Sequence, residues 1–208
     1  MNRDLLLETI EKIADTIIEN KEMLNDLDRA IGDADHGINM ARGFNEVKAK
    51  IDTVREKDCG DILKMVAMTL ISTVGGASGP LYGTAFMKAA AVAKGKMELE
   101  KQDFVDIYNQ AIEGIKMRGK SDKGCKTMLD ALIPAQEAFY ESIEKGQDLS
   151  EASKLAEIAA EKGVEYTKEI IATKGRASYL GERSIGHQDP GATSSYLILK
   201  VIAEVLAK

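Results

Sequence analysis

Three aspartates in one short segment have the types and spacing of ligands for a hard divalent cation. The apolar stripe of the preceding helical segment continues to Asp28, where an inward-facing carboxylate is costly unless it is paired or metal-bound. Gly32 and Gly37 bracket Asp33 and Asp35 and would permit a tight turn that folds both carboxylates back toward Asp28. Oxygen ligands without cysteine suit Mg²⁺ rather than Zn²⁺. The alternative is that Asp33 and Asp35 only cap the next helix.

A glycine-rich segment and a basic segment are further candidates. Residues 74–84 lie between two expected helices, where glycines let backbone N–H groups approach an anion, but the Gly-Lys-Ser/Thr ending of a Walker A loop is missing. A generic glycine-rich turn is the alternative. Residues 118–130 form a basic turn into a helix, for which a solvated loop is a sufficient explanation. Cys125 lies among lysines, but no evident base accompanies it, so a nucleophilic role is not expected.

The longest irregular stretch, residues 175–192, has the character of a binding loop or lid. Arg176 and Arg183 could hold phosphate oxygens, because a guanidinium recognises them bidentately. Asp189-Pro190 predicts a helix start, with the aspartate as N-cap and proline at the first helical position. A disordered surface loop is the alternative.

The elements that must position these segments are helical. Helix formers dominate between the glycines, aromatic residues make up 5%, and period-two runs are rare. The apolar residues Leu6, Ile10, Ile13, Ile17 and Leu24 fall on one helical face. The pattern predicts eight helices, the first from Leu5 onward and the others at 36–54, 59–73, 80–95, 102–118, 126–143, 150–173 and 191–206. Asp103 and Ser150 are expected as N-caps.

The order of helices and loops predicts where the chemistry lies. Most connections are short, so consecutive helices should be antiparallel neighbours. The four irregular loops follow the first, third, fifth and seventh helices, and such loops emerge at the same end of an up-and-down bundle; they are residues 30–37, 74–83, 118–127 and 173–191. We therefore expect an all-α, eight-helix up-and-down antiparallel barrel or bundle, one domain over residues 1–208, with its site at one end.

Composition excludes several classes of protein. The 208 residues are 44% apolar and 30% charged, too apolar for a disordered chain. A net charge of -6 argues against a nucleic-acid-binding surface. The most apolar run, residues 65–74, is far shorter than the roughly 20 residues of a spanning helix. Two cysteines and no signal-like segment make the cytoplasm the expected compartment and exclude secreted, membrane and fibrous proteins.

Taken together, the motifs closely resemble the nucleotide-binding L subunit of dihydroxyacetone kinase. They occur in the family's order and span nearly the whole chain. The matching segments are Leu27-Asp28 and residues 32–40, 75–83, 126–130, 175–179, 181–184 and 189–192. One departure stands out, since Lys123-Gly124-Cys125 replaces the Pro-Gly-Asp that the family usually has before Lys-Thr-Met.

The resemblance implies an eight-helix barrel that holds ADP or ATP and two Mg²⁺ ions at one end. It implies that Asp28, Asp33 and Asp35 hold the metals and act in catalysis with His36 and Arg176. It also implies a set of nucleotide-contacting residues: His36, Gly37, Ile38, Asn39, Ala77, Ser78, Gly119, Met128, Arg176, Asp189, Pro190 and Gly191.

The resemblance also implies the reaction and the partners. The nucleotide γ-phosphate would pass to dihydroxyacetone that a separate K subunit holds covalently on its own histidine. In family members that consist of a short chain of this kind alone, ADP stays bound. It is rephosphorylated there by the phosphohistidine-carrying M subunit of a phosphotransferase system. Two alternatives remain, an ATP-dependent kinase for dihydroxyacetone or a related ketose such as erythrulose, and a nucleotide-loaded partner of a transcription regulator. A purely structural bundle would not explain four motif loops at one end.

Overall fold

The predicted all-α architecture is confirmed. The computed structural model describes residues 1–208 and has no β-strand, only one isolated bridge between Asn2 and Glu98. The α-helices are α1 (Arg3–Glu19), α2 (Lys21–Ile31), α3 (His36–Lys50), α4 (Cys59–Thr73), α5 (Ser78–Ala93), α6 (Lys101–Gly119), α7 (Leu129–Glu144), α8 (Leu149–Tyr166) and α9 (Pro190–Leu206). Two 3₁₀ helices, η1 (Ile51–Val54) and η2 (Arg176–Ser184), complete the chain.

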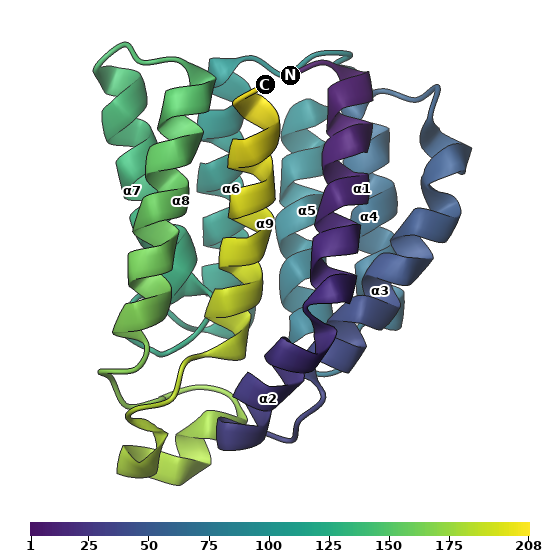
Figure 1. Ribbon diagram of the computed structural model, residues 1–208. Helices are drawn as coiled ribbons and strands as arrows, with labels where there is room; N and C mark the ends of the chain where they lie inside the picture. The colour runs from purple at the N-terminus through teal and green to yellow at the C-terminus, as the bar shows by residue number, and fades with distance from the viewer.

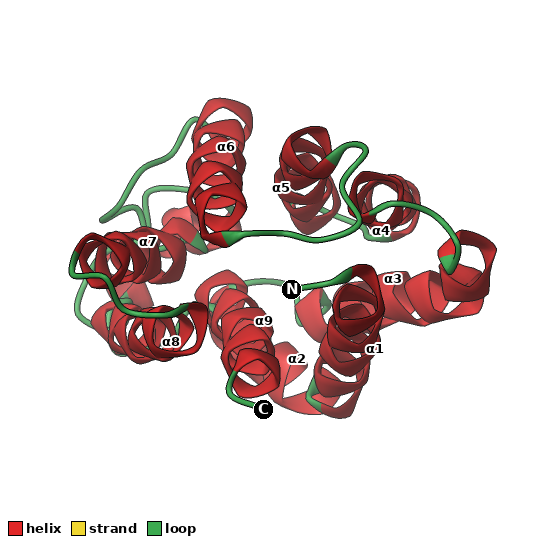
Figure 2. Cartoon of the chain, turned by 90° about the horizontal axis from the view of Figure 1, so that it is seen from above, coloured by secondary structure: helices red, strands yellow, loops and turns green.

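The helices form a closed ring around a central axis. α1 packs on α3, the helices from α3 to α9 then pack on one another in chain order, and α9 closes the ring against α1 (Figure 2). Both termini lie at one end of the ring, and α2 and η2 lie at the other (Figure 1). The eight helices of the ring correspond to the eight expected from the sequence.

Burial of one face of each helix produces this ring. The stripe of Leu6, Ile10, Ile13, Ile17 and Leu24 is buried, as predicted, within a core cluster of 42 residues. Gly163 allows α8 to approach α7 closely, because an added Cβ would lie 2.0 Å from the carbonyl oxygen of Asp130.

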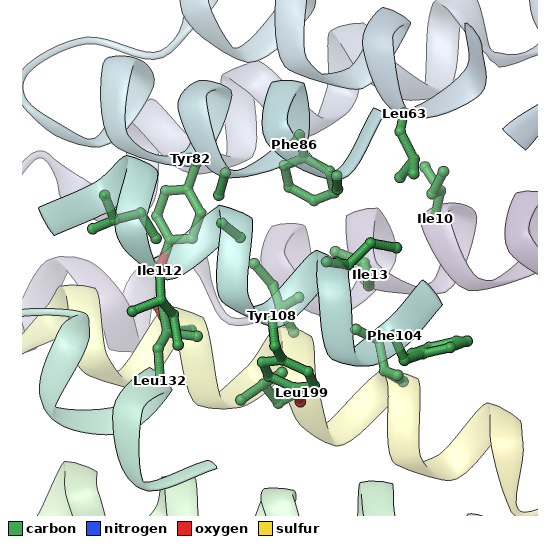
Figure 3. A pocket seen from close by; sticks show the side chains of 18 of the residues that line it. Ile10, Ile13, Leu63, Tyr82, Phe86, Phe104, Tyr108, Ile112, Leu132 and Leu199 are labelled. Atoms are coloured by element: carbon green, nitrogen blue, oxygen red, sulfur yellow. The ribbon is translucent and has the colours of Figure 1, made fainter. Parts of the chain in front are cut away.

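The ring leaves an apolar cavity of about 170 Å³ along its axis. Side chains such as Ile10, Phe86, Tyr108 and Leu199 converge on it from helices on opposite sides of the ring (Figure 3). A space lined in this way favours apolar contents over ordered water.

Four of the expected boundaries were wrong. The first helix breaks at Asn20, whose side-chain amide donates to the carbonyl of Thr16 at 2.8 Å, and α2 continues as a separate helix. The helix expected over 36–54 becomes 3₁₀ after Lys50, and the one expected over 150–173 ends at Tyr166. The helix expected from 126 begins at Leu129.

The two expected N-caps were also wrong, by two or three residues. Glu100 is the N-cap of α6, and Asp103 lies three positions later, where its carboxylate accepts the Glu100 N–H at 2.9 Å in a capping box. Asp148, not Ser150, caps α8 by accepting the Glu151 N–H at 2.9 Å. The expected start of α9 is confirmed, since Asp189 accepts the N–H of Ala192 and Pro190 opens the helix.

None of the helices combines the length and apolar character needed to span a lipid bilayer.

Candidate functional site

The four irregular loops meet at one end of the ring, as the order of helices predicted. They surround a cavity of about 400 Å³ beside α2 and η2, at the lower end of Figure 1. Most of the predicted site residues line it: Asp28, Asp33, Asp35, His36, Asn39, Ala77, Ser78, Gly119, Met128, Arg176, Asp189, Pro190 and Gly191. The cavity is polar, in contrast to the neighbouring apolar cavity, and Tyr82, Ile115 and Met128 line both.

Two predicted residues do not line the cavity. Gly37 packs beneath α2, where an added Cβ would lie 2.0 Å from the carbonyl oxygen of Lys21. The Ile38 N–H donates to the side chain of Asn25 at 3.0 Å, and its own side chain is 48% exposed on the outer surface. Both residues therefore hold α3 against α2 in this structure.

The three aspartates form a tight acidic cluster. One carboxylate oxygen from each of Asp28, Asp33 and Asp35 lies within 4.8 Å of the others. Asp28 is buried on the last turn of α2, and Asp33 and Asp35 are exposed to the cavity. Like charges at this separation repel one another strongly, and a hard cation coordinated by oxygen removes that repulsion. The donor set and spacing fit Mg²⁺.

The alternative of simple helix capping does not explain the cluster. Asp35 occupies the N-cap position of α3, but its side chain makes no capping hydrogen bond. Asp28 of α2 caps α3 instead, since its Oδ2 accepts the N–H of Asp35 at 2.9 Å and that of His36 at 3.2 Å. The carboxylates of Asp33 and Asp35 line the cavity and are accessible to a cation there.

The turn between α2 and α3 is built differently from what the glycines suggested. The left-handed residue is Ala34, with φ of 62°, rather than a glycine. Gly32 is needed for a close approach, because an added Cβ would lie 2.1 Å from the Oδ1 of Asp28. The glycine thus makes room for a carboxylate of the acidic cluster.

His36 is held as a neutral ring between two hydroxyls. Its Nε2 lies 2.9 Å from the Oγ of Ser194 on α9, and its Nδ1 lies 3.2 Å from the Oγ of Ser78 on α5. Burial lowers the pKa of His36 to about 4, against the opposing charges of Asp28 and Asp35. The imidazole therefore orients groups at the cavity wall without carrying charge near neutral pH.

The buried histidine gives the metal-free protein a predicted pH dependence. The unfolded chain binds the His36 proton near pH 6.5 and the folded chain only near pH 4, so folding stability falls as pH drops through that window. We expect a loss of about 3 kcal/mol between these limits. Urea unfolding in EDTA measures it, and His36→Gln should remove it while the exposed His187→Gln should not. Parallel stability curves for the wild type and His36→Gln would contradict this assignment.

The glycine-rich segment leads into α5 with its backbone open to the cavity. Gly76 has φ of 65°, and no side chain caps the α5 N-terminus at Ala77. Gly75 lies so close to Asn39 that an added Cβ would be 2.9 Å from its Oδ1. An uncapped helix N-terminus beside a positive-φ glycine presents N–H groups to an anion.

The long loop forms the ordered 3₁₀ helix η2. Arg176, its first residue, lies 2.8 Å from the carboxylate of Asp33 across the cavity. Gly181, with φ of 56°, kinks η2, and Arg183 beyond the kink is exposed and does not line the cavity. Of the two arginines considered as phosphate ligands, the structure brings only Arg176 to the site.

Asp189 is buried at the start of α9. Burial raises its pKa to about 7, although its Oδ2 accepts the N–H of Ala192 at 2.7 Å. Tyr82 closes this wall, since its hydroxyl lies 2.7 Å from the Oγ of Ser194 and 2.8 Å from that of Ser195. The cavity wall near α9 is therefore a fixed polar network.

Sequence reasoning missed several residues that line the cavity. The most notable is Lys126, which was read as part of a solvated basic turn but is 1% exposed. The cavity is also lined by Ser121 and Thr127 of the loop 118–127, by Lys174 of the loop 173–191 and by Tyr82 of α5. The motif Lys-Thr-Met before α7 was the available signal for Lys126 and Thr127, but the residue types alone did not separate them from surface lysines and threonines.

Comparison with known proteins agrees with this fold. Residues 30–204 match the DAK2 domain family, and the chain belongs to that family. It is 42% identical over 203 residues to the ADP-binding subunit DhaL of the PEP-dependent dihydroxyacetone kinase of Escherichia coli K12, covering 98% of this chain and 97% of that protein. It is 43% identical over 204 residues to the ADP-binding subunit of the PTS-dependent dihydroxyacetone kinase of Lactococcus lactis, covering 98% of each.

Solved structures share the fold. The native dihydroxyacetone kinase of C. freundii matches with a TM-score of 0.76, and its complex with AMP-PNP and Mg²⁺ matches with 0.72. Both are 24% identical to this chain and cover 97% of it, but the chain spans only 34% of their length. The same fold thus forms one part of those longer kinase chains.

Proposed function

We propose that this protein is the nucleotide-binding subunit of a dihydroxyacetone kinase. Its site would transfer a phosphoryl group from a bound nucleotide to dihydroxyacetone held on a separate K subunit. The observation that carries the proposal is the convergence of three aspartates, an open helix N-terminus and Arg176 on one cavity. Relatives that are 40–43% identical along nearly their full length are named as ADP-binding subunits of such kinases.

Each part of the site has a proposed role. Asp28, Asp33 and Asp35 would hold two Mg²⁺ ions, which, when bound, neutralise charge on the nucleotide phosphates and favour in-line displacement. The N–H groups beside Ala77 and Ser78 would bind phosphate oxygens. These N–H groups are already oriented before the reaction, so they can stabilise the developing charge without a cost of reorganisation. Such preorganised stabilisation is usually the largest electrostatic contribution to catalysis.

The remaining predicted residues would fix the nucleotide and its orientation. The buried, neutral His36 would hold the phosphate end of the cavity, with Asn39 beside it. The other proposed nucleotide contacts are Gly119, Met128, Asp189, Pro190 and Gly191, all of which line the cavity. We assign no general base to this chain, because the partner subunit would present the acceptor.

Exposed apolar side chains in the loop that carries Arg176 support a partner protein that brings the substrate. Tyr179 of η2 is 86% exposed and Ile185 is 45% exposed, both close in sequence to Arg176. Exposed apolar side chains beside a site are typical of a docking surface. We propose that the K subunit docks here, that an M subunit carrying phosphohistidine rephosphorylates ADP, and that residues 1–208 act as one cytoplasmic domain.

The first experiment identifies the nucleotide and the phosphoryl donor. Freshly purified, desalted protein is denatured, and any released nucleotide is identified by chromatography. About one ADP per chain that is lost on prolonged EDTA treatment is the expected result, and it indicates a retained cofactor and a phosphoprotein donor. An empty protein that binds Mg²⁺-ATP would favour an exchanging, ATP-dependent kinase. A protein that neither retains nor binds nucleotide would refute the proposed site.

A further inference from the structure

Lys126 is an almost completely buried cation beside the proposed nucleotide site. It is 1% exposed and lines the polar cavity. Its φ of 60° lies in the left-handed region, a strained conformation for a residue with a Cβ. A buried charge and a strained backbone at the same residue persist only where the surrounding structure holds both.

The ammonium group is satisfied by backbone carbonyls from two distant segments. Its Nζ donates to the carbonyl oxygen of Thr167, to that of His187 at 2.5 Å and, more weakly, to that of Ile170 at 3.5 Å. Three donors thus meet three acceptors, as an ammonium requires. Thr167 follows the end of α8, where carbonyls have no helical partner and the helix dipole favours a cation.

The backbone of Lys126 is itself held firmly. The buried Asp130 accepts the N–H of Gly124 at 2.5 Å through Oδ1 and the N–H of Thr127 at 2.8 Å through Oδ2. The loop around Lys126 is therefore tied to α7. Lys126 then ties α7, across the cavity wall, to α8 and to the segment before α9.

These ties end at the residues proposed to contact the nucleotide. Met128 lies two residues beyond Lys126, and Asp189 lies two residues beyond His187. The Asp189 N–H donates to the Thr167 hydroxyl at 3.0 Å. Thr167 therefore accepts hydrogen bonds from both Lys126 and Asp189. A shift of the ammonium would move Met128 and Asp189 relative to each other.

We propose that Lys126 is a positioning residue that fixes two of the segments lining the nucleotide cavity, Gly119–Met128 and Asp189–Gly191, at the spacing that the nucleotide requires. The proposal rests on the proposed function, because it takes the cavity to be a nucleotide site. It assigns the lysine no contact with the reacting atoms. It gives a reason for a lysine at a left-handed position where glycine would be unstrained. Its charge serves the geometry of the site rather than the solvent-facing role that its sequence context suggested.

The test compares Lys126→Met with Lys123→Met, which removes an exposed lysine of the same loop that pairs with Glu137. Binding of Mg²⁺-ADP is measured by calorimetry, and local opening is measured by hydrogen exchange with mass spectrometry. We expect affinity to fall at least about tenfold for Lys126→Met only, since displacements near 1 Å are costly at such sites. Exchange should accelerate within residues 121–130 and 167–192 and stay unchanged in α1, α4 and α5.

A second variant separates positioning from simple folding support. Lys126→Gly relieves the backbone strain but removes the ammonium, so it should bind Mg²⁺-ADP as weakly as Lys126→Met. Added n-butylammonium should restore part of the affinity, and tetramethylammonium, which cannot donate a hydrogen bond, should not.

Three results would overturn the inference. They are wild-type affinity in folded Lys126→Met, wild-type affinity in folded Lys126→Gly without an added amine, and faster exchange throughout the barrel. The last would make Lys126 a general fold-stabilising residue. A wild-type protein that fails to bind Mg²⁺-ADP would instead refute the proposed function, and this inference with it.

Discussion

Replacing Asp33 with asparagine is expected to weaken Mg²⁺-dependent ADP binding at least about a hundredfold without unfolding the protein. Removing a partner of a metal ligand typically costs about 10–100-fold, so removing a ligand itself should cost no less. Asp33 is exposed at the cavity and shares a 4.8 Å cluster with Asp28 and Asp35. The amide keeps the size of the side chain but removes the charge that a hard cation requires.

The same substitution should leave folding stability unchanged or slightly higher when metal is absent. Asparagine removes one of three mutually repelling carboxylates, and the lost ion pair with Arg176 is solvent-exposed. Calorimetry with Mg²⁺-ADP and thermal unfolding in EDTA measure the two effects separately. The matched control is Asp26→Asn, an exposed carboxylate on α2 that pairs with Arg29 outside the cavity. Normal Mg²⁺ and ADP binding by Asp33→Asn would refute the metal assignment.

The sequence predicted the end of the barrel that carries the site because that prediction depends on helix order alone. The break at Asn20 divides the first helix, but α2 still ends at the end of the ring opposite the termini. The loop after α2 therefore emerges at the expected end. The apolar rhythm also continued correctly to Asp28, which is buried on the same face of α2 as Leu24 and Ile31. A periodic pattern survives a local break when the face that it buries is unchanged.

Residues that depend on tertiary approach could not be predicted in this way. Gly32 and Gly37 were interpreted as turn residues, but each is required by the close approach of another group, the side chain of Asp28 and the backbone of Lys21 respectively. Lys126 lies in a lysine-rich turn whose composition indicates solvent exposure, and only the folded positions of Thr167 and His187 make its burial possible. Local sequence carries no signal for contacts 41 and 61 residues away.

The two arginines of the long loop illustrate the same limit. Both have the chemistry to bind phosphate, and they lie seven residues apart in one segment, Arg176 and Arg183. The kink at Gly181 in η2 separates them, so only Arg176 reaches the acidic cluster. Gly175, Gly181 and Gly186 all have positive φ, and nothing in the sequence singled out Gly181 as the position of the kink.

Replacing Arg176 with methionine is expected to slow phosphoryl transfer about a thousandfold while changing nucleotide affinity less than about tenfold. Arginines that stabilise the transition state of phosphoryl transfer contribute roughly 10³–10⁵ in turnover. Arg176 has a side chain that is 68% exposed and pairs with Asp33 at 2.8 Å, so its guanidinium can reorganise when Asp33 binds a cation. Single-turnover transfer from bound ATP to dihydroxyacetone, with a K subunit present, measures the rate.

The controls decide whether Arg176 acts on the reaction or only on Asp33. Arg183→Met removes the second arginine of η2, which does not line the cavity, and should leave the rate unchanged. Arg176→Lys should recover little, because an ammonium lacks the planar, bidentate fork of a guanidinium. An interaction made only in the transition state lowers kcat and kcat/KM together. If Arg176 merely neutralises Asp33, Arg176→Met would instead bind Mg²⁺ more tightly and transfer at the wild-type rate, and the catalytic assignment would be wrong.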